Sequence, residues 1–459
     1  MHAAIARALA RADAEWERSL ERLSALVRIP SCSFPGWDPA AVVASAEATA
    51  QWLADAGFPS VEVVAGGGPH PAVIAEDRRA GPQRPTLLLY AHHDVQPPRE
   101  LARWRSPPFA PQIRDGRLYG RGAADDKGGI LCHAAAAAAW NATAGAPPLN
   151  LLALIEGEEE IGSPHLPELL AAHGERLRAD AVLVMDAGNI AAGLPCITLS
   201  LRGLVVAELE VRALAAPLHS GIWGGTVPDP ALVLARVLSG LADERGWLSG
   251  ERADSARSWA EIPYHPAWFA AAAGLAVPGA ALASAAEACA AAWERSALTV
   301  TACAAGDLAG GNAIAECARA RLALRVAPGE DSAAAAAALC ARIEALAPPT
   351  VRCAVQTREA VPGWRGDAAH PLFWTLRRAL AEGYGRPPLL IGCGATIPLV
   401  PALARRYPGV PLLLVGIEDP QCAAHAENEG LLLDDARAAL RSEIILFGLL
   451  AEGGEGLAG

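Results

Sequence analysis

Residues 86–94 read TLLLYAHHD, an apolar run that ends in two histidines and an aspartate. Mostly apolar runs of about five or six residues, rich in Leu and Val, are typical of strands that are buried on both faces of a sheet. Similar runs occur at residues 151–155, 181–185 and 410–415, and segments with helical periodicity lie between or beside them. This order predicts an α/β fold with a mixed, mostly parallel sheet that is covered by helices.

The middle of the chain has a different pattern, which indicates an inserted domain. Residues 318–326 alternate between apolar side chains and charged or small ones, as expected of a half-buried strand. Further strand-like segments and two helical patterns surround this one. We therefore predict a discontinuous domain formed by residues 1–204 and 358–459, with an α+β domain inserted at 205–357.

The composition excludes several classes of protein. The chain has 459 residues and a net charge of −12, from 38 basic and 50 acidic side chains, which argues against nucleic acid as a partner. Only 19% of residues are charged, so the chain is not mainly disordered, and no uninterrupted apolar stretch reaches the ~18 residues of a membrane span. Residues 1–26 mix charged residues with Ala and Leu, which favours an amphipathic helix over a secretory signal. Ten scattered cysteines without a CxxC pair then favour reduced thiols in the cytoplasm.

Ionisable residues follow each of the four predicted strands. His92 and Asp94 end the first strand, glutamates at 158–160 follow the second, Asp186 follows the third, and the fourth leads into a loop with His425. Ligands bind outside the carboxyl ends of the strands in open α/β sheets, so we expect these side chains to meet. Each group alone has a plainer interpretation, such as a surface turn or a solvated helix start, but together at strand ends they indicate one site.

A metal site explains this density of charge, because carboxylates repel one another unless a cation lies among them. The loop at residues 119–129 adds Asp125 and Asp126, although such a pair before a helix is also typical of an N-cap. Imidazoles together with carboxylates suit zinc, with manganese and cobalt as alternatives. Strand alternation puts His92 and Asp94 on one face, so the carboxylate can orient the ring. Among three adjacent glutamates, one can bind metal while its neighbour takes a proton from water.

These motifs together resemble a known family. The sequence is similar to the co-catalytic zinc metallopeptidases, which include carnosine dipeptidases, aminoacylase, carboxypeptidase G and succinyl-diaminopimelate desuccinylase. The likeness is closest to the dipeptidase-like subgroup, through HHDVQPP, RGAADDKGG and LHSGIWGGTV. The matching segments run in family order across nearly the whole chain: LLLYAHHDVQPP (87–98), LYGRGAADDKGG (118–129), EGEEEIGS (156–163), VLVMDAG (182–188), LHSGIWGG (218–225), GNAIAECARARLALRVAPGE (311–330), GATIP (394–398) and AHAENEG (424–430).

The resemblance implies two divalent metal ions per chain, with Zn²⁺ expected and Mn²⁺ or Co²⁺ as alternatives. It makes a hydroxide between the metals the nucleophile, Glu159 the general base and Asp94 the carboxylate that orients His92. It also implies a cis peptide bond between Asp125 and Asp126. The implied metal ligands are His92 and Asp186 for one ion, Glu160 and His425 for the other, and Asp125 as the bridge.

The resemblance makes the insert a lid and dimerisation domain, so a homodimer is expected. His219 is implied to enter the partner's site and stabilise the oxyanion, although a histidine beside a glycine turn is ordinary when it stands alone. Arg325 is implied to bind a substrate carboxylate through its planar guanidinium, although an exposed strand arginine has the same pattern. Asn312 and the loop with Gly394 and Thr396 complete the expected substrate contacts.

Two stretches depart from the family pattern, and both fall among the expected substrate contacts. Residues 392–396 read GCGAT where dipeptidase-like members usually have Arg-Glu-Gly-Gly-Ser, and the His-Gly pair expected near Glu359 is absent. The methyl group of Ala395 crowds backbone that a glycine would leave open. Because the metal ligands are spared, the sequence predicts intact hydrolytic chemistry and leaves the substrate open.

The expected function is metal-dependent hydrolysis of the amide bond in dipeptides or related small peptides. An N-acyl-amino-acid amidohydrolase or carboxypeptidase of the same family is the alternative, because Arg325 fits a carboxylate in either substrate. A non-catalytic binding protein on this fold is disfavoured, because every expected ligand is present. A serine hydrolase is disfavoured because the chain lacks a Gly-x-Ser-x-Gly motif.

Overall fold

The computed structural model describes residues 2–248, 259, 261–307 and 310–452. The chain forms two compact units. Unit 1 comprises Met1–Leu199, Gly366–Ile391 and Ile397–Gly459, and unit 2 comprises Ser200–Arg365 and Gly392–Thr396.

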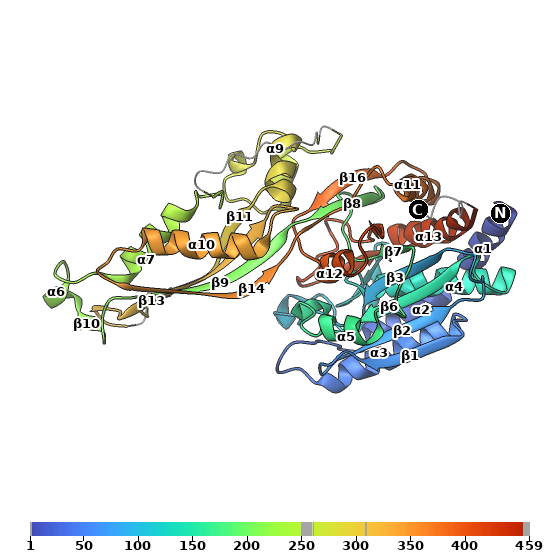
Figure 1. Ribbon diagram of the computed structural model, residues 1–459, viewed down its shortest axis with the longest axis horizontal. Coiled ribbons are helices and arrows are strands. Elements are labelled where there is room, and N and C mark those ends of the chain that lie inside the picture. The colour runs from blue at the N-terminus through green and yellow to red at the C-terminus, as the bar shows by residue number, and fades with distance from the viewer. Residues whose placement is uncertain (1, 249–258, 260, 308–309, 453–459) are drawn as a thin grey trace. The chain divides into compact units, whose positions relative to one another are not determined.

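The four predicted strands form the centre of the sheet in unit 1, in the order β6-β3-β7-β17; Figure 1 labels the first three of them. All three pairings between them are parallel. Antiparallel strands extend the sheet on both sides, with β2 and β1 beyond β6 and with β8 beyond β17. This mixed sheet with a parallel centre confirms the predicted α/β class. The strands are β1 (Ser60–Ala65), β2 (Pro71–Asp77), β3 (Thr86–His92), β6 (Asn150–Glu156), β7 (Ala181–Val184), β8 (Cys196–Leu201) and β17 (Leu412–Leu414).

Helices cover this sheet and bury its apolar side chains. α4 (Lys127–Ala144) starts directly after the loop that carries Asp125, and it contacts β3. It also packs against α1 (His2–Ala14) and α13 (Leu433–Glu452), as Figure 1 shows. Seven of the 13 buried residues of α4 are alanines or glycines, and such small side chains let neighbouring helices approach closely. The loop before α4 is therefore attached to the most buried helix of the unit.

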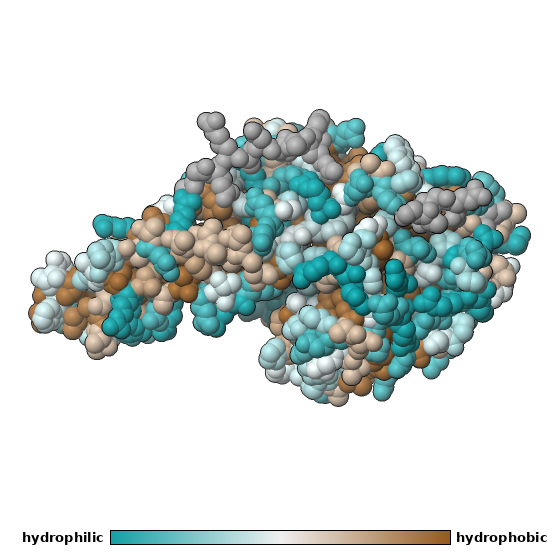
Figure 2. Space-filling model, in the orientation of Figure 1, coloured by the Kyte–Doolittle hydropathy of each residue, from teal (hydrophilic) through white to brown (hydrophobic). Residues whose placement is uncertain are grey.

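Unit 2 is an α+β structure, as predicted for the insert. Its antiparallel sheet has the order β11-β13-β9-β14, and α7 and α10 pack on one face of it (Figure 1). The outward side of α10 is mostly alanine, which gives the pale brown area over this helix in Figure 2. The elements are α7 (Pro230–Leu241), α10 (Ser332–Leu346), β9 (Gly203–Arg212), β11 (Ala297–Ala305), β13 (Cys317–Val326) and β14 (Arg352–Val361).

The bounds of unit 2 differ from the predicted insert at 205–357. β9 pairs with both β13 and β14 over its whole length, so the hydrogen bonds keep all three strands in one unit. The predicted limits cut through β9 and β14, because the apolar alternation shows the strands less clearly near their ends. Among the helices of the described residues, none is both long enough and apolar enough to span a membrane.

Candidate metal centre

The carboxyl ends of the central strands bring all five predicted metal ligands together in unit 1. His92 ends β3, Asp186 follows β7, Glu160 lies in the short turn after β6, and His425 lies in the loop after β17. Asp125 comes from the loop before α4. Because the four strands are parallel neighbours, their carboxyl ends meet at one edge of the sheet.

Asp125 joins the two halves of this cluster. Its Oδ1 atom lies 3.0 Å from Nε2 of His92, and its Oδ2 atom lies 2.9 Å from Nε2 of His425. An oxygen of Asp186 lies 3.8 Å from the same nitrogen of His92, and an oxygen of Glu160 lies 3.2 Å from the same nitrogen of His425. One carboxylate thus faces two imidazole–carboxylate pairs, which is the arrangement expected of two neighbouring metal positions that share a ligand.

The chemistry of the donor groups fits divalent cations. Imidazole nitrogens and carboxylate oxygens are ligands that Zn²⁺, Mn²⁺ and Co²⁺ all accept. Three sets of side chains each offer ligand atoms within 4.8 Å of one another: His92, Asp126 and Asp186; Asp125, Glu160 and His425; and Asp125, Asp186 and Glu418. Asp126 and Glu418 extend the predicted ligand set.

Asp126 has a structural role beside the cluster. Its Oδ1 atom accepts a hydrogen bond from the backbone N–H of Gly129 at 3.2 Å, so it is the N-cap of α4. Its Oδ2 atom accepts one from the backbone N–H of His92 at 3.3 Å. The peptide bond between Asp125 and Asp126 is cis, as the resemblance implied. The N-cap interpretation thus applies to Asp126, while Asp125 points into the cluster.

Asp94 contacts more than the His92 ring. The ring Nδ1 lies 3.1 Å from the carbonyl oxygen of Asp94 and 3.4 Å from its carboxylate. The carboxylate also accepts hydrogen bonds from the backbone N–H groups of Glu159 and Glu160, at 3.2 and 3.1 Å, and from the hydroxyl of Ser33 at 2.7 Å. Asp94 therefore connects the end of β3 to the turn that carries two of the predicted site residues.

Two further residues hold the predicted ligands in place, and the sequence analysis assigned neither a role. The fully buried carboxylate of Glu429 accepts hydrogen bonds from Arg121 and from the backbone N–H groups of Gly122, Ala124 and Asp125. Gln96 donates to both carboxylate oxygens of Glu160, through its backbone N–H at 3.1 Å and its side-chain amide at 2.7 Å. Glu429 lies in the motif AHAENEG and Gln96 in HHDVQPP, so their place in family motifs was the one sign in the sequence that they belong to the site.

Burial and mutual repulsion shift the pKa values in the cluster. Burial raises the pKa of Glu160 to about 7, and the charge of Asp125 adds to the rise. Burial also raises the pKa of Glu159 well above its ordinary value, with the charge of Asp186 as the next cause. Although burial opposes it, hydrogen bonds to the two imidazoles hold the pKa of Asp125 below its ordinary value. These carboxylates need positive charge nearby, which imidazolium groups or divalent cations supply.

The predicted substrate-binding residues lie in unit 2 as two groups. His219 and Asn312 are neighbours, because β10 (Leu218–His219) pairs with β12 (Ala313–Ile314) and the Ser220 N–H donates to the Asn312 carbonyl. Near the other end of β13, the guanidinium of Arg325 donates to the hydroxyl of Thr396 at 3.1 Å.

Arg202 organises the second of these groups, and the sequence analysis did not identify it. Its guanidinium donates to the Gly394 carbonyl at 3.3 Å, and its own carbonyl accepts a hydrogen bond from the Thr396 hydroxyl at 2.6 Å. Burial lowers the pKa of Arg202 to about 10, and the charge of Arg325 adds to this effect. Two neighbouring guanidinium groups favour an anion beside them.

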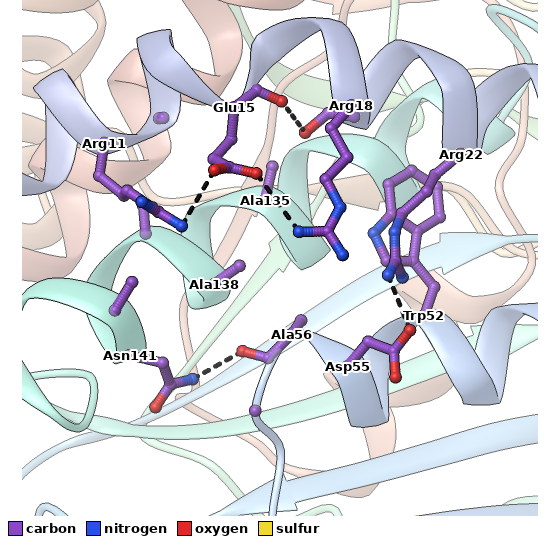
Figure 3. Close-up of a pocket in the computed structure, with 15 residues that line it drawn as sticks. Arg11, Glu15, Arg18, Arg22, Trp52, Asp55, Ala56, Ala135, Ala138 and Asn141 are labelled. Atoms are coloured by element: carbon purple, nitrogen blue, oxygen red, sulfur yellow. Dashed lines mark hydrogen bonds and ion pairs between the residues drawn. The ribbon is translucent and has the colours of Figure 1, made fainter.

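A separate hollow of about 360 Å³ lies between α1, α2 (Trp16–Val27), α3 (Pro39–Asp55) and α4 (Figure 3). Alanines of α4 line it together with Trp52. Arginines that line the hollow form ion pairs with acidic side chains that also line it. Arg11 lies 2.9 Å from Glu15, and Arg22 lies 2.7 Å from Asp55 (Figure 3). None of the predicted metal ligands lines this hollow, so it is separate from the candidate metal centre.

Comparison with known proteins identifies the family. Residues 88–442 match the model of Peptidase family M20/M25/M40. The chain belongs to this peptidase family. A cysteinylglycine-S-conjugate dipeptidase of Corynebacterium striatum is 33% identical over 374 residues, which cover 79% of this chain and 81% of that protein. The Cys-Gly metallodipeptidase DUG1 of Saccharomyces cerevisiae is 33% identical over 239 residues, 49% of this chain and 50% of that protein. These relatives confirm the likeness to the dipeptidase-like subgroup.

Solved structures of family members have the same fold. The dipeptidase Dug1p from Saccharomyces cerevisiae superposes with a TM-score of 0.84 at 23% identity, covering 98% of this chain and 99% of that one. Human carnosine dipeptidase 1 superposes with a TM-score of 0.83 at 21% identity, with the same coverage. At these identities the likeness establishes the fold, and the arrangement of side chains at the strand ends carries the argument about chemistry.

Proposed function

We propose that this protein is a dinuclear metal-dependent dipeptidase. The observation that carries the proposal is the position of Asp125, whose two carboxylate oxygens face Nε2 of His92 and Nε2 of His425. His92 and Asp186 would hold one metal ion, Glu160 and His425 would hold the other, and Asp125 would serve both positions. The family assignment supports the same conclusion, as do two relatives, the cysteinylglycine-S-conjugate dipeptidase and the Cys-Gly metallodipeptidase.

The metal ions supply positive charge that lowers the pKa of water and polarises the scissile carbonyl. Zn²⁺ suits the mixed nitrogen and oxygen donors, and Mn²⁺ and Co²⁺ are the alternatives. Side chains of the protein move the proton and bind the substrate.

Glu159 is the general base and later the general acid. One of its carboxylate oxygens lies 4.0 Å from Nε2 of His92, and the side chain is mostly buried. The carboxylate removes a proton from the attacking water and delivers it to the leaving amine nitrogen, a role that suits a carboxyl group with a raised pKa. Asp94 fixes the position of this base by accepting the N–H of Glu159.

Arg325 and Thr396 bind the substrate's terminal carboxylate in this proposal, supported by the adjacent guanidinium of Arg202. His219 stabilises the oxyanion in the site of a partner subunit, so the active form is a homodimer. The His219 ring supports this role, because its Nδ1 accepts the N–H of Gly221 at 3.1 Å. That bond leaves the proton on Nε2, which is then a donor in an exposed side chain.

The test compares Glu159→Gln with the control Glu175→Gln, whose side chain is 76% exposed. Each variant is loaded with Zn²⁺, Mn²⁺ or Co²⁺ and assayed on cysteinylglycine, β-alanyl-histidine and N-acyl amino acids. Glu159→Gln is expected to bind metal normally and to lose about 10²–10⁴-fold in kcat, the usual contribution of general acid–base catalysis. Near-normal turnover by Glu159→Gln would refute the assignment. Turnover of N-acyl amino acids alone would favour the amidohydrolase alternative.

We also propose a cytoplasmic location. All ten cysteines are free thiols, which suits a reducing compartment.

A further inference from the structure

Glu418 lies beside the predicted metal ligands Asp125 and Asp186. The chain after β17 runs beside the chain after β7: the Val415 N–H donates to the Val184 carbonyl, and Gly188 forms a parallel bridge with Glu418. The Asn189 N–H donates to the Glu418 carbonyl at 2.6 Å. These hydrogen bonds therefore hold the backbone at Glu418 against the segment after β7, which carries the predicted metal ligand Asp186.

Gly416 permits this close approach. A Cβ atom at this position would lie 1.1 Å from the carbonyl oxygen of Ala187, so only glycine fits. The register of β7 and β17 pairs Val184 with Leu414. Counting in steps of two along the paired segments places the side chains of Asp186 and Glu418 on the same face.

The Glu418 carboxylate points into the cluster without a protein donor. Its oxygen and those of Asp125 and Asp186 come within 4.8 Å of one another. In the described part of the chain, no hydrogen bond or ion pair reaches this carboxylate. By contrast, the carboxylates of Asp126 and Glu429 in the same neighbourhood accept hydrogen bonds from backbone N–H groups. Glu418 is half-buried, so water or a cation can be the partner of its carboxylate, and repulsion among the three carboxylates favours a cation.

We propose that Glu418 is an additional carboxylate ligand of the metal position formed by His92, Asp125 and Asp186. Glu418 thereby raises the affinity of this position for Mn²⁺ relative to Zn²⁺. The proposal rests on the proposed dinuclear site. One imidazole and three carboxylates fill the four coordination positions that Zn²⁺ usually takes, whereas six-coordinate Mn²⁺ keeps two positions for water. The three carboxylates also make the set rich in the oxygen donors that Mn²⁺ favours.

The experiment measures metal binding rather than turnover. Metal-free wild type, Glu418→Gln and Glu418→Asp are titrated with Mn²⁺ alone and with Zn²⁺ alone, in competition with a chelating dye. Glu427→Gln is the matched control, because it removes the same charge from the same loop outside the three ligand sets. We expect Glu418→Gln to weaken Mn²⁺ binding at one of the two positions by about 10–100-fold and Zn²⁺ binding much less. Glu418→Asp should fall between wild type and Glu418→Gln, and Glu427→Gln should match wild type.

Three outcomes overturn the inference: unchanged Mn²⁺ affinity in Glu418→Gln, an equal loss for both metals, or an equal loss in Glu427→Gln. Circular dichroism verifies that each variant is folded. A crystal structure of the Mn²⁺-loaded wild type gives a test that is independent of folding in the variants, and a Glu418 carboxylate outside coordination distance overturns the inference. Failure of the wild type to bind two metal ions refutes the proposed function itself, so the two failures are distinguishable.

Discussion

Glu429→Gln provides a quantitative test of how the metal-binding loop is held. The Glu429 carboxylate is fully buried and accepts four hydrogen bonds, including 2.7 Å from the Arg121 guanidinium and 3.1 Å from the Asp125 N–H. In the variant, the amide oxygen still accepts from the N–H groups of Ala124 and Asp125. The amide NH₂ group, however, is itself a donor and lies where Oε2 accepted hydrogen bonds. The N–H of Gly122 and the Arg121 guanidinium therefore lose their acceptor.

The expected loss follows from these contacts. Arg121 is 1% exposed, and in the variant it keeps the carbonyl oxygens of Pro97 and Ala426 as acceptors and the Trp104 ring, whose centroid lies 5.6 Å from the guanidinium carbon. Removal of one partner of a buried ion pair costs about 3–5 kcal/mol. Unit 1 spans 288 residues, and at ~2.1 cal/mol/K of unfolding entropy per residue each kcal/mol lowers the Tm by about 1.7 °C, so the Tm should fall by about 5–8 °C. Because Asp125 is anchored by the same carboxylate, metal affinity should also fall about 10–100-fold.

The assay is thermal unfolding of the metal-free protein, followed by circular dichroism, together with a Zn²⁺ titration of the folded variant. Glu427→Gln, two residues away, is the control for the loss of one negative charge in the same loop, and its Tm should stay close to that of wild type. A Tm for Glu429→Gln within about 1 °C of wild type would refute the reasoning. It would mean that Arg121 and the loop amides are satisfied without the carboxylate.

Three further predictions test other parts of unit 1 and the proposed dimer. Gln96→Ala should keep the fold but weaken metal binding at one position by about 10–100-fold, as measured by titration, because the Glu160 oxygen that accepts from the side-chain amide loses this donor, while the backbone N–H still donates to the other oxygen. Although burial opposes it, the charge of Glu443 raises the pKa of His133 above 6.5. The stability from this pair is therefore complete below pH 6.5 and is lost as pH rises through the higher folded value; urea unfolding of His133→Gln at several pH values should lack this loss. Mixing Glu159→Gln with His219→Ala should restore part of the activity if subunits exchange, and exchange without restored turnover would contradict the shared site.

Asp94 illustrates why one residue at a strand end can affect several steps. Its carboxylate contacts the ring of one predicted metal ligand and the backbone of the proposed base. It also accepts a hydrogen bond from Ser33, which comes from the segment after α2. The strand-end position was predicted from the sequence. The contact with Ser33 was not, because 61 residues separate the two in the chain.

The sequence by itself determined the central strands and the residues at their ends. A strand that is buried on both faces appears in the sequence as a run of five to seven apolar residues, which can be recognised without knowing the fold. β3 and β6 accordingly lie close to their predicted positions. The parallel arrangement then requires that groups after these strands meet at one edge. Four of the five predicted ligands were found together for this reason, while Asp125 comes from the loop before α4; spacing and family motifs supplied their identities.

Only the tertiary structure decided which groups hold these ligands and where unit 2 begins. Glu429 contacts Arg121 across 308 residues of chain, and Gln96 contacts Glu160 across 64. The periodicity of the sequence cannot predict such pairs, because a long-range hydrogen bond depends on where the fold brings two atoms and not on their spacing in the chain. The same reason applies to Glu418, which the sequence shows as one more acid after a strand. The close approach of two backbones at Gly416 turns it toward the cluster.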